Sequence, residues 1–199
     1  MRALVFLHGL TIDGRDGAVL ARALPAYAVR APLLPGHGAP PVDDWSPRAI
    51  AAALVVGLPS EPVVLVGHSW GAAIAMHLAA RAPARIAALV LLDGGWFDRA
   101  DLPPRAPPRD PHHAAALDAL FATRSSDAWP AIAAARIPTL AIAGADDAGA
   151  TKRALLARFV LAVPHADTVV LDDVGHDLLR DAPVEVGAAI AAWVHRLPA

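Results

Sequence analysis

The chain has 199 residues, of which 56% are hydrophobic and 18% are charged, and its formal net charge at pH 7 is −2. This length suits one domain with one core and is too short for two full-sized domains. The apolar content excludes an intrinsically disordered chain, and the near balance of charge excludes the basic surface of a nucleic-acid-binding protein. Cysteine is absent, which excludes disulfides, thiolate metal ligands and a cysteine nucleophile.

Two apolar stretches resemble export or membrane signals. The first, residues 1–7, ends at His8 and Gly9 before the apolar core of a signal peptide is complete. The second, residues 62–80, is uncharged and long enough to span a bilayer, but a Gly-His-Ser-Trp-Gly sequence interrupts it. We therefore expect a cytoplasmic protein with no membrane partner and no nucleic-acid partner.

The hydrophobic pattern predicts alternating strands and helices. Short aliphatic runs alternate with longer Ala-rich stretches, as in βαβ units around a parallel sheet that is buried on both faces. The predicted strands are 3–7, 26–31, 63–66, 88–92, 139–143 and 168–171. The predicted helices are 17–24, 47–58, 71–81, 114–123, 151–161 and 184–196. Ser46 before Pro47 is typical of a helix N-terminus.

The long segment between the fourth and fifth predicted strands departs from the regular alternation of strands and helices. Prolines between residues 103 and 111 forbid a regular helix there. Long irregular insertions are often lids or binding loops, and the alternative is a solvated loop with no role. We predict one domain, residues 1–199, with a short cap insertion at about residues 95–137.

The sequence Gly67-His68-Ser69-Trp70-Gly71 lies between a predicted strand and a predicted helix. In this setting Gly-x-Ser-x-Gly forms a sharp, strained turn that exposes the serine hydroxyl at the carboxyl edge of a sheet. The serine needs a base and an orienting acid to become a nucleophile. Ser69 is thus the candidate catalytic nucleophile.

Candidate partners for the serine follow the last three predicted strands. His176 comes after the last strand and is the predicted base. The Gly-x-x-Asp spacing after the fifth strand favours Asp147 as the acid, with Asp146 and Asp93 as alternatives. The backbone N–H groups of Leu10 and Trp70 are the predicted oxyanion hole, because one follows the first strand and the other starts the helix after the serine.

Four motifs agree in order and spacing with one known family. They are His8-Gly9, Gly36-His37-Gly38, the Gly67 to Gly71 turn, and Gly175-His176, each after a predicted strand. With them the chain resembles the α/β-hydrolase superfamily over nearly all of its length. The resemblance implies a three-layer α/β fold with a mainly parallel six-stranded sheet in the order 2-1-3-4-5-6. It also implies that the superfamily's usual N-terminal hairpin is missing and that the cap is short.

The nucleophile narrows the chemistry that the resemblance implies. Dehalogenase and epoxide-hydrolase relatives carry aspartate at the turn, whereas serine indicates acyl transfer through an acyl-enzyme. We expect a small to medium carboxylic ester as substrate, without a cofactor or metal. The alternatives are a thioesterase, a cofactor-free perhydrolase, and a non-catalytic ligand receptor. His37, Trp96, Phe97 and Trp129 are candidate substrate-binding residues, although the three aromatic residues equally suit packing of the cap onto the sheet.

Overall fold

The computed structural model describes residues 3–10, 15–103, 109–145 and 149–197. Within these residues six strands form one parallel sheet in the order β2-β1-β3-β4-β5-β6, which confirms the predicted fold class and strand order. The strands are β1 (Ala3–Leu7), β2 (Ala28–Arg30), β3 (Val63–His68), β4 (Ile86–Leu92), β5 (Thr139–Ala145) and β6 (Ala166–Asp172).

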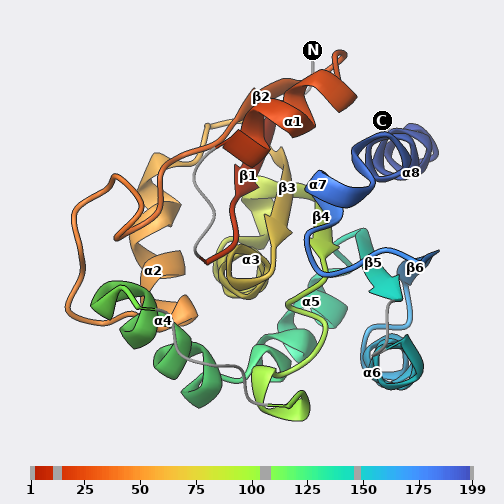
Figure 1. Ribbon diagram of the computed structural model, residues 1–199. Helices are drawn as coiled ribbons and strands as arrows, with labels where there is room; N and C mark the ends of the chain where they lie inside the picture. Colours follow the sequence, from red (N-terminus) through yellow and green to blue (C-terminus); the bar gives the residue numbers. More distant parts are fainter. Residues whose placement is uncertain (1–2, 11–14, 104–108, 146–148, 198–199) are drawn as a thin grey trace.

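Helices cover both faces of the sheet (Figure 1). The α-helices are α1 (Arg15–Ala23), α2 (Pro47–Leu54), α3 (Trp70–Arg81), α4 (Pro111–Ala122), α5 (Trp129–Ala135), α6 (Gly149–Ala162), α7 (Leu178–Asp181) and α8 (Pro183–His195). Short 3₁₀ turns lie at Val55–Gly57, Pro83–Arg85, Arg99–Asp101 and Ser125–Ala128. Among the described residues, no helix has both the length and the apolar character needed to cross a bilayer.

The strands divide their side chains between two hydrophobic cores. In β1, Val5 and Leu7 pack on one face with α2, α3 and α6, whereas Leu4 and Phe6 pack on the other with α1, α7 and α8. The same alternation continues through β3, β4 and β5, because successive side chains of a strand point to opposite faces. A sheet buried on both faces explains why these strands read as continuous apolar runs.

The ends of several elements differ from the expected ranges. The β2 strand is only three residues long because Tyr27 N–H donates to Leu24 O and closes a turn before it. Helix α2 stops at Leu54 and tightens into a 3₁₀ turn ahead of Pro59. Its N-terminus is as predicted, since the Ser46 hydroxyl accepts a hydrogen bond from Ala49 N–H at 3.2 Å.

The long segment between β4 and β5 contains α4 and α5. Helix α4 begins after Asp110, whose carboxylate accepts hydrogen bonds from two N–H groups in the first turn. Asp98 ties the segment together, because its carboxylate accepts from both Ser126 N–H and the Ser126 hydroxyl. Helix α5 then packs against α3 and α6, so part of this segment contributes to the core.

Candidate active site

Ser69 occupies a sharp turn between β3 and α3. Its backbone has φ 54° and ψ −116°, a conformation that costs energy for any residue with a side chain. The turn is held by close backbone packing, because a Cβ on Gly71 would lie 2.1 Å from Leu7 O. A Cβ on Gly67 would lie 2.5 Å from Gly71 O, so glycine is required at both positions. The geometry places the Ser69 side chain at the carboxyl ends of the central strands.

His176 lies on the loop after β6 and contacts both Ser69 and Asp93. Its Nε2 is 2.9 Å from Ser69 Oγ, and its Nδ1 is 2.6 Å from Asp93 Oδ2. An ionised carboxylate can only accept, so Nδ1–H donates to Asp93 and Nε2 accepts from the Ser69 hydroxyl. This tautomer leaves Nε2 with a lone pair directed at the proton that a nucleophilic serine must lose.

Asp93 ends β4 and is almost completely buried. Its φ of 43° is unusual for a residue other than glycine. Its Oδ1 accepts from Gly144 N–H at 3.3 Å, and its Oδ2 accepts from Lys152 Nζ at 2.9 Å as well as from His176. Burial alone would raise the pKa of Asp93, but the hydrogen bonds and charges of His176 and Lys152 outweigh burial and hold that pKa below its ordinary value.

The structure therefore brings Asp93 to the position beside His176 that the sequence spacing favoured for Asp147. Asp147 and its alternative Asp146 lie outside the described residues. One local signal pointed to Asp93, because two glycines follow it directly. A Cβ on Gly94 would lie 2.5 Å from Ser69 O, so the chain after Asp93 runs directly against the turn that bears Ser69.

His68 anchors the loop that bears His176. Its Nε2–H donates to His176 O at 2.8 Å, and the two imidazole rings lie 5.2 Å apart. Burial, with a smaller contribution from the nearby His176, lowers the pKa of His68 to about 4. His68 is consequently neutral throughout the physiological range and acts as a hydrogen-bond donor to the backbone.

The depressed pKa of His68 predicts a loss of stability in acid. An unfolded histidine titrates near pH 6.5. Below that pH the unfolded state therefore binds a proton that His68 does not bind in the folded state. The contribution of His68 to the free energy of unfolding is fully present above about pH 6.5. It is lost progressively as the pH falls toward the pKa of about 4 that His68 has in the folded protein. We expect this one group to lower the free energy of unfolding by about 2 kcal/mol between about pH 7.5 and about pH 5.

Urea unfolding of the His68→Gln variant measures this contribution. The glutamine keeps an N–H donor but does not titrate, so its unfolding free energy should depend less on pH than that of the parent protein. His195→Gln, a change at an exposed histidine of α8, is the matched control and should behave as the parent does. An identical pH dependence in the parent and in His68→Gln would contradict the assignment.

The loop after β1 lies against the Ser69 turn. His8 is buried, its Nδ1–H donates to Gly9 O at 2.9 Å, and its Nε2 accepts from Leu34 N–H at 3.2 Å. These bonds fix the backbone just before Leu10, one predicted oxyanion donor. The other, Trp70, is the first residue of α3, where backbone N–H groups have no acceptor within the helix.

His37 lies next to this loop and to the segment between β4 and β5. Its ring stacks on that of His113 at 4.2 Å and is 4.9 Å from that of His8 and 5.6 Å from that of Trp70. Burial, opposed by a hydrogen bond to Pro35 O, lowers the pKa of His37. The contact with Trp70 places His37 beside the residue that follows the candidate nucleophile.

The other candidate substrate-binding residues are packed in the core. Trp96, Phe97 and Trp129 are all buried, and the rings of Trp96 and Phe97 meet edge to face at 4.6 Å. Trp129 Nε1–H donates to Gly95 O at 3.2 Å. These contacts attach the segment between β4 and β5 to the sheet, and a role in substrate binding stays a prediction.

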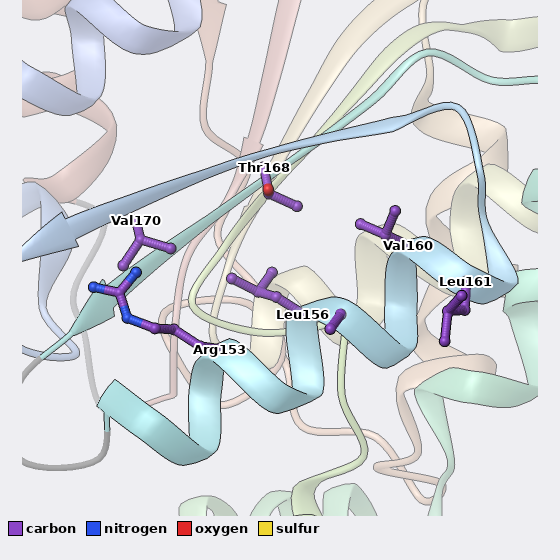
Figure 2. A pocket seen from close by; sticks show the side chains of 7 residues that line it. Arg153, Leu156, Val160, Leu161, Thr168 and Val170 are labelled. Carbon is purple, nitrogen blue, oxygen red and sulfur yellow. The ribbon is translucent and has the colours of Figure 1, made fainter.

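A groove of about 450 Å³ lies elsewhere, between α6 and β6 (Figure 2). Leu156, Val160 and Leu161 of the helix and Thr168 and Val170 of the strand line it. None of its lining residues is Ser69, Asp93 or His176. The groove is therefore separate from the candidate active site.

Curated proteins similar to this chain include enzymes named for ester hydrolysis. Lipase LipV of Mycobacterium tuberculosis is 48% identical over 91 residues, which are 44% of this chain and 35% of that protein. Pimeloyl-[acyl-carrier protein] methyl ester esterase of Aromatoleum aromaticum is 41% identical over 90 residues, 45% of this chain and 36% of that protein. The matched stretches thus span about a third of the length of these relatives.

Comparison with solved structures and with family descriptions extends this likeness to the fold. A thermophilic esterase of Thermogutta terrifontis superposes with a TM-score of 0.73 at 22% identity, covering 98% of this chain and 90% of that one. At that identity the likeness concerns the fold alone. Residues 4–124, more than half of the chain, match the alpha/beta hydrolase family. Together with the parallel sheet and the turn at Ser69, this match shows that the chain belongs to the alpha/beta hydrolase family.

Proposed function

We propose that the protein is a serine hydrolase that cleaves a small to medium carboxylic ester. The observation that supports this most is the continuous hydrogen-bonded chain from Ser69 Oγ through His176 to Asp93. A nucleophile, a base and an orienting acid in hydrogen-bond contact are the arrangement that acyl transfer requires. In this proposal Asp93 takes the role that the sequence spacing favoured for Asp147.

Acylation begins when Ser69 Oγ attacks the ester carbonyl carbon. His176 Nε2 takes the hydroxyl proton, and Asp93 stabilises the imidazolium through Nδ1–H. The oxyanion that forms on the carbonyl oxygen accepts hydrogen bonds from Leu10 N–H and Trp70 N–H, each worth about 3 kcal/mol in related enzymes. His176 then gives its proton to the departing alcohol oxygen, the ester C–O bond breaks, and the acyl group remains on Ser69.

Deacylation repeats the sequence with water. A water molecule gives a proton to His176 Nε2 and attacks the acyl carbon, forming a second oxyanion at the same donors. Collapse of this intermediate breaks the bond to Ser69 Oγ, which recovers its proton from His176. One water is consumed, and one alcohol and one acid are released for each ester cleaved.

The names of the relatives and the composition of the site favour esters over the alternatives. Both curated relatives described above are named for ester hydrolysis. Trp96, Phe97 and Trp129, the aromatic candidates for substrate binding, are apolar, and the sequence has no long run of basic residues that would hold a polyanionic acyl group. A small or medium ester with an apolar acyl part is therefore the proposed substrate class.

A fluorophosphonate probe tests the nucleophile without a choice of substrate. The probe phosphonylates a serine only where a base and an oxyanion hole activate it. We expect rapid labelling of one equivalent, observed by intact mass, with the adduct on the peptide that contains Ser69. The Ser69→Ala variant is the control and should stay unlabelled.

Failure to label would contradict the proposal if the protein is folded. Near-ultraviolet circular dichroism of the same sample establishes folding. A folded, unlabelled protein would favour the non-catalytic receptor among the alternatives. If labelling succeeds, parallel assays with a p-nitrophenyl ester, an acyl-CoA thioester and hydrogen peroxide as acceptor distinguish the esterase from the thioesterase and the perhydrolase.

A further inference from the structure

Lys152 is the only lysine in the chain, and it is buried. Arginine supplies each of the other sixteen cationic residues among the seventeen Lys and Arg. Most of a protein's lysines are exposed, because an ammonium group loses strong hydration on burial. Only 6% of the Lys152 side chain is accessible to solvent. The single use of lysine therefore coincides with a buried position.

Lys152 contacts the candidate triad, which is the hydrogen-bonded set Ser69, His176 and Asp93. Its Nζ donates to Asp93 Oδ2 at 2.9 Å and to Gly144 O at 2.8 Å. Asp93 Oδ2 is also the oxygen that accepts from His176 Nδ1–H. Gly144 N–H in turn donates to the second carboxylate oxygen, Asp93 Oδ1. Lys152 and Gly144 together thus hold both oxygens of the carboxylate that faces His176.

The position of Lys152 in α6 shows that its charge does not serve to stabilise the helix. It is the fourth residue of α6, close to the N-terminus, where the helix dipole disfavours a positive charge. An uncompensated ammonium there would be costly, and Asp93, whose side chain is 1% exposed, supplies the compensating charge. A compact ammonium also presents three donors to a narrow site, whereas a guanidinium needs a wide planar one.

We propose that Lys152 is a positioning residue that acts on His176 through Asp93. It holds the carboxylate oriented toward Nδ1, and its positive charge offsets the negative charge that the carboxylate places beside the imidazole. This inference rests on the proposed function, because it assumes that His176 is the base.

The charged and titratable groups around His176 determine the direction of the expected effect. Within the part of the chain that the structure describes, they are Asp93 after β4, Lys152 on α6, His68 at the end of β3 and Asp177, the residue after His176. Removal of Lys152 leaves the negative charge of Asp93 uncompensated beside the imidazole. A negative charge favours imidazolium, so the base should be lost at a higher pH.

The test is the pH dependence of kcat/KM for Lys152→Met on a p-nitrophenyl ester. Methionine is similar in length and carries no charge. We expect the acidic limb of the profile to move up by about one pH unit and kcat to fall about tenfold, with KM little changed. Arg153→Met is the matched control, since it removes one positive charge from the next residue of the same helix at an exposed ion pair with Asp172. That control should leave the limb in place.

A double-mutant cycle with Asp93→Asn separates positioning from simple structural support. The quantity compared is the rate at which the fluorophosphonate probe labels Ser69. If Lys152 acts through Asp93, Lys152→Met should change this rate by less than about threefold in the Asp93→Asn background. The proposal would be overturned if Lys152→Met lowered the labelling rate equally in the parent protein and in Asp93→Asn. It would also be overturned if the acidic limb of the kcat/KM profile of Lys152→Met stayed in place or moved to lower pH. If Lys152→Met does not fold, Lys152→Gln removes the charge and keeps a donor for Gly144 O, and the same limb shift is expected.

The outcomes also separate this inference from the function on which it rests. Full activity in Asp93→Asn would mean that the proposed triad is wrong. A large loss in Asp93→Asn together with an unchanged limb in Lys152→Met would mean that only the role of Lys152 is wrong.

Discussion

Replacing Ser69 or His176 by alanine should each lower kcat by a factor on the order of 10⁵ to 10⁶, and combining the two replacements should add little further loss. Ser69 Oγ is 2.9 Å from His176 Nε2, so neither group has its proposed function without the other. An alanine at position 69 leaves no nucleophile, and an alanine at position 176 leaves a hydroxyl that cannot lose its proton.

Steady-state kinetics on a p-nitrophenyl ester measures these losses for the two single variants and the double variant. Residual hydrolysis should be similar in all three, because oxyanion stabilisation and substrate binding outlast the loss of the nucleophile. Losses that add in free energy across the two positions would contradict the proposal that they act as a unit. His195→Ala, an exposed change on α8, is the control for histidine removal and should retain full activity.

Asp93→Asn should lower kcat by about 10⁴-fold with little change in KM. The asparagine amide can donate to His176 Nδ1, which stabilises the wrong imidazole tautomer and places a proton on Nε2. Nε2 then cannot accept from Ser69. The 2.6 Å contact between His176 Nδ1 and Asp93 Oδ2 is the reason to expect the effect here.

Asp146 and Asp147, the other two carboxylates that the sequence offers as the acid, give a direct comparison. Asp146→Asn and Asp147→Asn should each change kcat by less than about tenfold if Asp93 is the acid. A loss on the order of 10⁴ in Asp147→Asn, with Asp93→Asn nearly unaffected, would return the role to Asp147. The three variants need only one assay, and each removes a single carboxylate without changing side-chain size.

The strand pattern and the Ser69 turn were readable because both depend on local sequence. A parallel strand buried on both faces needs a continuous apolar run, so β1, β3, β4 and β5 were located close to their true bounds. The turn at Ser69 was found because Gly67 and Gly71 are required at fixed offsets from the serine. The sheet order followed from the family resemblance, not from these patterns alone.

Other elements were missed or misplaced because their limits depend on packing. The four-residue helix α7 is too short to show a hydrophobic period, and β2 lies at an edge where few neighbours define its ends. Helix α5 is stabilised by contacts with α3 and α6, which are distant in sequence. Such segments have no local pattern strong enough to set their boundaries.

The sequence by itself determined the class of fold, through the alternation of apolar runs and Ala-rich stretches along the chain. It also determined the candidate nucleophile and the candidate base, because each lies in a motif of adjacent residues. Only the tertiary structure decided which carboxylate lies against His176 and that Lys152 holds it. Asp93 and His176 are 83 positions apart, and Asp93 and Lys152 are 59 apart. Their contacts arise because β4, β5 and β6 end at one edge of the sheet, and the strength of a buried ion pair depends on a distance and a burial that no linear spacing specifies.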